Sequence, residues 1–304
     1  MRSIRPGYLL VILSAFLFAA AGNAVKVLFH LGYAPLVLAQ LRIGWAFAWL
    51  LLALLALRPA LLRIRPADLP ALTIFGCVGL AGVQLSYYLT IARLNIAVAL
   101  LVQYLGLVAV AAFERFAKGR AVTTRVWSAL VMVLVGAFFA VGAYQPSLLR
   151  VNLPGIIVGL ISAAFFAFYL LRASALAQRM NTWTILVYGF GLGTVMWALY
   201  DAGTRTSLPS DLRIWAAMAL IGLLGTLVAH GGFVLGLRSV RASSAGIVST
   251  TEPVFAGLIA FLVLGDRLQW LQLLGASVIV AGVITVQLGE RTRDAAMTPA
   301  AILP

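Results

Sequence analysis

The stretch Ala242–Gly265 reads ASSAGIVSTTEPVFAGLIAFLVLG, and it decides how the rest of the chain is interpreted. It is apolar and long enough to cross a bilayer, which takes about 20 helical residues. Near its middle it carries Glu252 and Pro253. On insertion scales, Asp at the centre of a membrane helix costs about 2.5–3.5 kcal/mol, and proline removes a backbone donor and disturbs the preceding turn. We therefore predict a disturbed helix whose Glu252 faces a polar interior and not lipid.

The composition extends this apolar character to the whole chain. Of its 304 residues, 63% are hydrophobic and only 10% are charged, and the mean hydropathy is +1.07. These values are typical of a polytopic helical membrane protein. A net charge of +14 would suggest a nucleic-acid partner in a soluble protein. Here the basic residues lie in short loops, so we interpret them as topology signals and expect no nucleic-acid partner.

Ten apolar stretches are long enough to span the hydrocarbon core, so we expect an all-α fold with ten transmembrane helices. The first could mimic a signal peptide, but its apolar run is longer than a signal's usual core, and the repeat described below needs it. The ten stretches are Tyr8–Phe29, Leu36–Leu57, Ala71–Ala92, Ile96–Phe116, Val126–Ala143, Gly155–Leu176, Trp183–Tyr200, Trp215–Leu237, Ala242–Gly265 and Leu271–Leu288.

The distribution of lysine and arginine predicts the orientation. If the N-terminus is cytoplasmic, the inner segments hold fifteen of these residues, among them Arg2, Arg5 and Arg291, and the outer ends hold six, among them Arg150 and Arg205. This bias favours cytoplasmic N- and C-termini, in agreement with an even number of helices.

The two halves of the chain resemble one another. Residues 6–19 align without a gap on residues 154–167, and Pro, Gly, Ser, Ala, Phe and Ala coincide at a constant offset of 148. Residues 103–108 fall near residues 250–255 in the same way. We therefore predict two five-helix repeats, 1–150 and 151–304. An odd number of helices in each inverts the second, an arrangement often used for alternating access around a midplane site. The alternative is an ancient duplication with no retained mechanism.

Several motifs then resemble a known family. A Ser/Ala-rich start precedes Glu252-Pro253, Asp266-Arg267 follows in the next turn, and the last helix contains Gly275. Together they resemble the drug/metabolite transporter superfamily, specifically its EamA-type ten-helix exporters. The resemblance implies a bacterial inner-membrane transporter of small organic solutes, usually an exporter, with amino acids a frequent cargo. Where the family commonly keeps a first-half proline, the chain has Leu105-Gly106, and glycine would still permit a bend.

Glu252 is the sharpest candidate for substrate binding. It could bind an ammonium group or exchange a proton with the solvent. The alternative is a structural acceptor that holds the disturbed helix together. Thr251 belongs to the same region, and the repeat places Gln103 and Tyr104 opposite it.

Further candidates lie on the other predicted helices. Gln84 and Tyr88 share one helix face at i and i+4, and Tyr87 flanks them. His230 suits a proton relay, because histidine titrates near neutral pH. Each of these side chains could instead be a packing partner between helices. The remaining candidates lie on helices that the family uses for its cavity, and they are Asn23, Ser162 and Tyr169.

Three functions compete. A secondary transporter of amino acids or similar metabolites needs a small-molecule substrate and the lipid bilayer, with protons as one open choice of coupling ion. A transporter of organic cations such as quaternary amines would use an aromatic cage beside a carboxylate, which Tyr87, Tyr88, Tyr104 and Glu252 could supply if they converge. A membrane enzyme needs a nucleophile with a base, or a metal cluster.

The chemistry of the chain argues against the enzyme. It has one cysteine, Cys77, and two separated histidines, and it lacks a P-loop. We therefore expect no enzymatic activity, no metal and no cofactor. The sequence leaves monomer and homodimer open.

Overall fold

The computed structural model describes residues 6–146, 152–204 and 208–297, and within these ranges every regular element is helical. Arg2, Arg5, Arg150 and Arg205 lie outside them, as does the predicted boundary between residues 150 and 151. The elements of the first half are α1 (Pro6–His30), α2 (Pro35–Leu57), η1 (Pro59–Leu62), η2 (Pro66–Asp68), α3 (Leu69–Ile74), η3 (Phe75–Ala81), α4 (Gly82–Ile91), α5 (Ile96–Ala112), η4 (Phe113–Ala117) and α6 (Thr124–Ala140). Those of the second half are α7 (Leu153–Ala177), α8 (Thr182–Thr204), α9 (Leu212–Gly222), η5 (Leu223–Val228), α10 (Ala229–Gly236), α11 (Ala242–Ser249), α12 (Glu252–Ile259), η6 (Ala260–Leu264) and α13 (Trp270–Met297).

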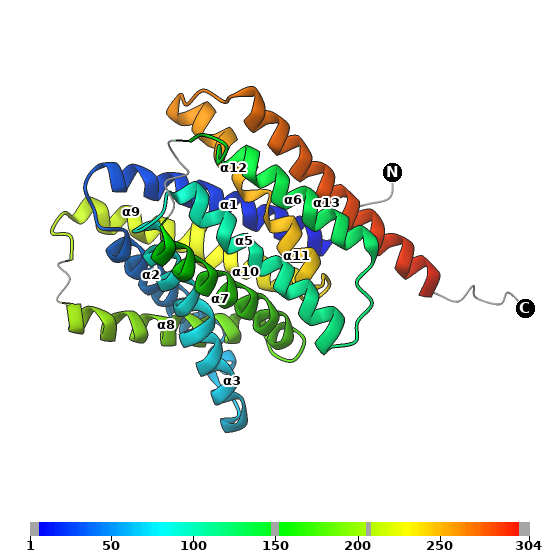
Figure 1. Cartoon of the computed structure of the whole chain (residues 1–304). Helices are drawn as coiled ribbons and strands as arrows, with labels where there is room; N and C mark the ends of the chain where they lie inside the picture. Colours follow the sequence, from blue (N-terminus) through cyan, green and yellow to red (C-terminus); the bar gives the residue numbers. More distant parts are fainter. Residues whose placement is uncertain (1–5, 147–151, 205–207, 298–304) are drawn as a thin grey trace, which may run out of the picture.

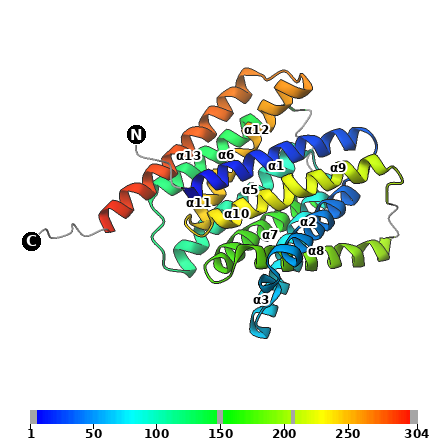
Figure 2. The same cartoon turned by 180° about the vertical axis from the view of Figure 1, so that it is seen from behind.

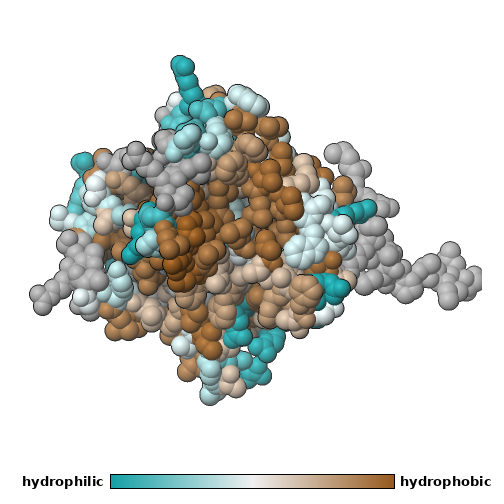
Figure 3. All heavy atoms as spheres, in the orientation of Figure 1, coloured by the Kyte–Doolittle hydropathy of each residue, from teal (hydrophilic) through white to brown (hydrophobic). Residues whose placement is uncertain are grey.

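Consecutive helical elements join into longer helices that can span a membrane. Nine helices in the described ranges are long and apolar enough to cross a bilayer, and α6, with 17 residues, is a shorter apolar helix. Hydrophobic side chains cover much of the face seen in Figure 3, and hydrophilic residues gather toward its margins. The predicted all-helical membrane fold is confirmed.

The repeat is visible in an unusual local feature. Four segments adopt the wider π-helical turn: η3 and η4 in the first half, and η5 and η6 in the second. The starts of η3 and η5 are 148 residues apart, and those of η4 and η6 are 147 apart. Because π segments are rare and are enriched at functional sites, their recurrence at matching positions supports the two-repeat fold.

The two halves interlock instead of lying side by side. The first helix of each half packs against the third and fourth spans of the other half: α1 contacts α10, α11 and α12, while α7 contacts α4 and α5. The last helices, α6 and α13, lie alongside each other in both views (Figures 1 and 2). The centre of the molecule is therefore built from both halves.

Glycines permit the closest of these contacts, as is usual between membrane helices. A Cβ atom on Gly275 of α13 would lie 2.4 Å from the Ala140 nitrogen and 2.5 Å from the Gly136 oxygen of α6. Gly106 plays the same role in α5, since a Cβ there would lie 2.4 Å from the carbonyl oxygen of Ala163. Helix α5 runs unbroken from Ile96 to Ala112, so the chain does not break at Gly106.

Candidate functional site: a polar cavity at the centre of the bundle

The predicted break in Ala242–Gly265 is confirmed and lies at two residues. Helix α11 ends at Ser249 and α12 begins at Glu252, with Pro253 in its first turn. Between them, the Thr250 and Thr251 nitrogens donate to the carbonyls three residues earlier, at 3.2 and 3.1 Å. The Thr250 and Thr251 hydroxyls donate to the same two carbonyls, at 2.6 and 2.9 Å. These hydroxyl bonds reinforce the tight turn that ends α11 directly before Pro253.

Burial differs on the two sides of this break. All eight residues of α11 are buried, whereas Pro253 is the only residue of α12 that is buried. One half of this span is thus packed tightly into the bundle. The other half, α12, is packed less tightly, and Glu252 lies where the two halves of the span meet.

Glu252 lines a central cavity of about 210 Å³. Its polar lining comes from six different spans of both halves, as the interlocked repeats predict. Apolar and aromatic side chains fill the wall between the polar groups. The lining residues are Phe18, Arg42, Gly79, Leu80, Val83, Gln84, Tyr87, Tyr88, Leu100, Gln103, Tyr104, Phe166, Tyr169, His230, Phe233, Ser249 and Glu252.

Glu252 has an unusual environment for a carboxylate inside a membrane helix. Among the described residues, neither of its oxygens has a hydrogen-bond or ion-pair partner, and the side chain is only partly buried. It occupies the first turn of α12, where the helix dipole favours a negative charge. A carboxylate without a protein partner is free to bind a ligand in the cavity.

Arg42 of α2 lines the same cavity, and hydrogen bonds to η5 hold its guanidinium in place. Its Nε donates to the Thr226 hydroxyl and its Nη2 donates to the Gly225 carbonyl, both at 3.2 Å. No hydrogen bond from Nη1 to another described residue exists in the structure. Because guanidinium binds carboxylates through parallel N–H groups, Arg42 can serve as an anion subsite in the cavity.

Aromatic rings form one wall of the cavity around His230. The imidazole lies edge-on to Phe18, with centroids 4.8 Å apart, and to Phe190, at 5.5 Å. Its Nδ1 lies 2.8 Å from the Thr226 carbonyl oxygen. Since a carbonyl only accepts, Nδ1 carries the hydrogen, and in the neutral ring Nε2 is an acceptor. The hydroxyls of Tyr104 and Tyr169 are buried and have no partner among the described residues.

A second cavity of about 530 Å³ continues from the first. The two share Phe18, Arg42, Tyr87, Tyr88, Leu100 and Glu252. The other lining residues of the second cavity include Phe29 near the end of α1, Asn95–Ala97 at the start of α5, and Gln272 near the start of α13. The combined space therefore leads from Glu252 to the end of the bundle where these helix termini lie.

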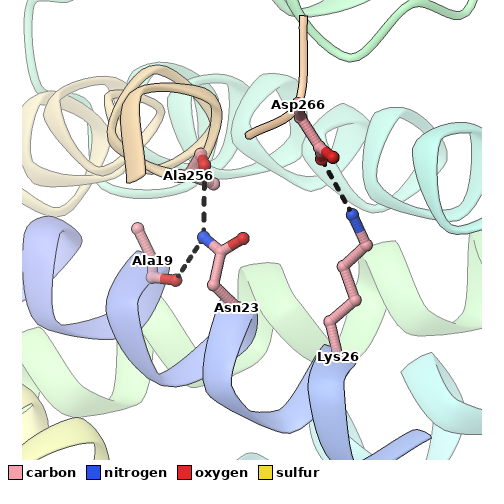
Figure 4. A network of polar contacts seen from close by, with 5 residues as sticks. All are labelled: Ala19, Asn23, Lys26, Ala256 and Asp266. Atoms are coloured by element: carbon pink, nitrogen blue, oxygen red, sulfur yellow. Dashed lines mark hydrogen bonds and ion pairs between the residues drawn. The ribbon is translucent and has the colours of Figure 1, made fainter. Parts of the chain in front are cut away.

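Figure 4 shows the polar contacts that Asn23 and Lys26 of α1 make with Ala256 of α12 and with Asp266. Asn23 points toward α12, and its Nδ2 donates to the carbonyls of Ala19 and Ala256 at 3.1 and 3.2 Å. One turn further along α1, Lys26 forms an ion pair with Asp266 at 3.4 Å, with both side chains about half exposed. These contacts connect α1 to the middle of α12 and to Asp266, which follows η6.

The structure brings most of the predicted site residues together. Asn23 lies in the second cavity, while Ser162 and Thr251 line neither one. Ser162 is fully buried and accepts a 3.0 Å hydrogen bond from Gln103 Nε2 behind the cavity wall. The predicted residues that line the central cavity are Gln84, Tyr87, Tyr88, Gln103, Tyr104, Tyr169, His230 and Glu252.

From the sequence, Arg42 could guide a carboxylate or pair with a helix end, and it was not among the predicted site residues. The available signal was its position, because a charged residue well inside an apolar span seldom faces lipid. Within the described ranges, no group of three or more His, Cys, Asp or Glu side chains could hold a metal ion.

A polytopic helical bundle with a polar cavity at its centre and inverted repeats around it is typical of membrane transporters. The family model of the EamA-like transporter family matches residues 5–142 and again residues 153–288, so the chain belongs to that family. The chain is thus a membrane transporter of small molecules, in agreement with the expected family.

Several curated relatives are similar to this chain over most of their length. The chain is 26% identical over 299 residues to the uncharacterized inner membrane transporter YicL of Salmonella typhimurium, covering 96% of this chain and 99% of the relative. It is 27% identical to the pseudopaline exporter CntI of Pseudomonas aeruginosa, covering 93% and 94%. It is 25% identical to the threonine/homoserine exporter RhtA of Escherichia coli, covering 90% and 88%. A solved crystal structure has the same fold, with a TM-score of 0.82 at 19% identity over 96% of this chain and all of the other.

Proposed function

We propose that this protein is a secondary transporter that exports small amphipathic zwitterions, in particular amino acids, by alternating access. One observation carries the proposal: the unpartnered carboxylate of Glu252 and the anchored guanidinium of Arg42 line the same central cavity. An α-amino acid presents an ammonium and a carboxylate on one carbon. Two opposite charges in one cavity match that pair better than they match a simple cation or a simple anion.

The substrate ammonium would bind to Glu252 and its carboxylate to the free Nη1 of Arg42. Gln84 and Tyr88 line the cavity with an amide and a phenol that can accept or donate further hydrogen bonds. Phe18, Leu100 and Phe166 supply apolar surface for the side chain of the substrate. A few polar groups in a mostly apolar concave site are typical of small-molecule recognition.

Export is the proposed direction of transport, and the names of two relatives support it, whereas the shape of the site and the predicted orientation indicate only which side of the membrane the cavity faces. The cavity leads to the bundle end formed by Phe29 and Asn95, and the other end is packed around α11. With cytoplasmic termini, this is an outward-facing state. The names of CntI and RhtA describe exporters, and threonine and homoserine are zwitterions, which supports export of this class. We place the protein in a bacterial inner membrane, with protons as the coupling ion to test, as a monomer or a homodimer.

The second candidate is a transporter of organic cations. It is favoured by the arrangement of Tyr87, Tyr88 and Tyr104 in the same cavity as Glu252, since aromatic faces and a carboxylate bind quaternary ammonium groups. Arg42 counts against it, because a second positive charge in the cavity repels a cation that has no carboxylate.

Counterflow in proteoliposomes without an imposed pH gradient decides between the two. The labelled panel contains phenylalanine and threonine, phenethylamine as the analogue without a carboxylate, 3-phenylpropionate as the analogue without an ammonium, tetraethylammonium, and a nucleoside. We expect uptake of labelled phenylalanine that unlabelled threonine competes away, and no uptake of 3-phenylpropionate. Uptake of the amines with none of the amino acids would replace the zwitterion proposal with the cation transporter.

A further inference from the structure

The π-helical segment η5 lies directly behind the cavity. One of its backbone hydrogen bonds is shifted from the α-helical pattern. In an α-helix the Ala229 nitrogen would donate to the Gly225 carbonyl, four residues earlier. Here it donates to the carbonyls of Leu224 and Thr226 instead. The Gly225 carbonyl has thus lost its usual helical partner, and Arg42 Nη2 donates to it at 3.2 Å.

Thr226, the next residue, supports two cavity side chains from different spans. Its hydroxyl accepts from Arg42 Nε at 3.2 Å, and its carbonyl accepts from His230 Nδ1 at 2.8 Å. Thr226 is completely buried and does not line the cavity itself. It therefore acts on the cavity only through the residues that it holds.

Close packing brings η5 within reach of α2. A Cβ atom on Gly222 would lie 2.6 Å from the Trp45 Cβ and 3.2 Å from the Arg42 carbonyl oxygen. A Cβ atom on Gly225 would lie 2.2 Å from the Cβ of Ala21. The absence of side chains at both glycines lets the π segment approach α1 and α2 closely enough for Arg42 to reach it.

The matching segment of the other half lacks this arrangement. In η3 the Gly82 nitrogen likewise bypasses the carbonyl four residues earlier and donates to Cys77 and Gly79. At the offset of 148 residues, Thr226 corresponds to Val78 and Arg42 to Phe190, neither of which can make a side-chain hydrogen bond. The duplicated π segment thus occurs twice, but of η3 and η5 only η5 carries a hydroxyl side chain and accepts hydrogen bonds from an arginine of α2.

From this geometry we infer that Thr226 is a positioning residue for the substrate carboxylate: it fixes Arg42 in the cavity and aims its free Nη1 at the ligand. The inference deepens the proposed function and rests on it for the identity of the ligand. An anchored arginine loses less conformational freedom on binding than a mobile one. The hydroxyl of Thr226 is therefore expected to matter for substrates with a carboxylate and not for substrates without one.

The first test reads the position of Arg42 without any transport. The purified full-length protein is treated with phenylglyoxal, and modification of Arg42 is followed by peptide mass spectrometry. Thr226→Val keeps the size of the side chain but removes the acceptor, and we expect it to raise the rate at Arg42 by about fivefold, the effect of one hydrogen bond. Thr226→Ser should react at the wild-type rate. The matched control is Thr285→Val in α13, where the lost hydroxyl bonds only to its own helix at Ala281 and to Met132. An unchanged Arg42 rate in Thr226→Val overturns the inference, whatever the substrate is.

The second test compares the KM values for phenylalanine and phenethylamine in counterflow. Thr226→Val should raise the KM for phenylalanine by about fivefold and leave that for phenethylamine unchanged, and Thr226→Ser should restore it. An equal rise for both compounds assigns Thr226 a general packing role and overturns the inference. Absence of amino-acid uptake by the wild-type protein, together with faster Arg42 modification in Thr226→Val, rejects the proposed function while the anchoring of Arg42 stands.

Discussion

At the scale of single residues, the site depends on charges that are kept inside a membrane without neutralising one another directly. Glu252 has no partner among the described residues, and Arg42 is bonded to neutral groups of η5. Buried charges that lack a partner are expensive. The presence of both charges is therefore better explained by the binding of a ligand than by a contribution to the stability of the fold.

The corresponding prediction concerns Glu252→Gln, which keeps the shape of the side chain and removes its charge. We expect counterflow of phenylalanine per folded molecule to fall by at least about tenfold, because an ammonium group loses its counter-charge. The yield of folded protein, measured by size-exclusion chromatography, should stay near that of the wild type.

Asp211→Asn is the matched control for this variant. Asp211 lies outside both cavities and caps α9 by accepting from the Arg213 nitrogen, which asparagine can also do. If Glu252→Gln transports as well as Asp211→Asn does, Glu252 has an architectural role only.

At the scale of helices, the positions of the glycines are explained better by the close packing of neighbouring helices than by backbone flexibility. Gly106 lies in an unbroken helix, and its missing side chain makes room for the Ala163 carbonyl of α7. The described part of the second half has a break near the cavity, between α11 and α12, where proline and three hydroxyl side chains occur together. The two repeats thus share a fold but differ at the residues that face the centre.

Gly106→Ala tests this interpretation. Its Cβ would lie 2.4 Å from a backbone oxygen, so α5 and α7 must separate, and overpacking of this kind destabilises by about 1–3 kcal/mol. We expect a lower Tm in detergent solution. Gly44→Ala in α2 is the control, because a Cβ there meets no atom within 4 Å and alanine favours the helix. Equal Tm values for the two variants would show that α5 and α7 are not tightly packed at Gly106.

At the scale of the whole molecule, the bundle is open toward one end and closed toward the other. The cavities extend from Glu252 to Asn95 and Gln272. Toward the opposite end, α11 is entirely buried, and Ser243 at its start donates a 2.5 Å hydrogen bond to buried Glu114 of η4. Inverted repeats can exchange the open and closed ends, so this asymmetry is expected of one state in a transport cycle.

Cysteine labelling tests both the cavity and the orientation. In a Cys77→Ala background, which removes the chain's one cysteine, we introduce Gln84→Cys or Gln103→Cys. Both positions line the central cavity, so a membrane-impermeant maleimide added from the periplasmic side should label them, and phenylalanine should slow the reaction. Labelling only from the cytoplasmic side would reverse the predicted orientation, and complete protection from both sides would remove these positions from an aqueous cavity.

Much of this protein was determined by properties that are local in the sequence. The apolar spans follow from the length needed to cross a bilayer, and the broken helix follows from Pro253 and its hydroxyl neighbours. The shared face of Gln84 and Tyr88 follows from helical periodicity. The constant offset between the halves was readable because each repeat kept its spacing.

Only the tertiary structure decided which side chains of different spans meet. The rotation of each helix about its axis is set by packing against neighbours far away in sequence, and spacing along one helix cannot reveal it. That is why Ser162 and Thr251 lie outside the cavities while Arg42 lies within both. The anchoring of Arg42 on η5 has the same origin, since it requires a displaced backbone bond, two glycines and a threonine to come within reach of a helix 180 residues earlier in the chain.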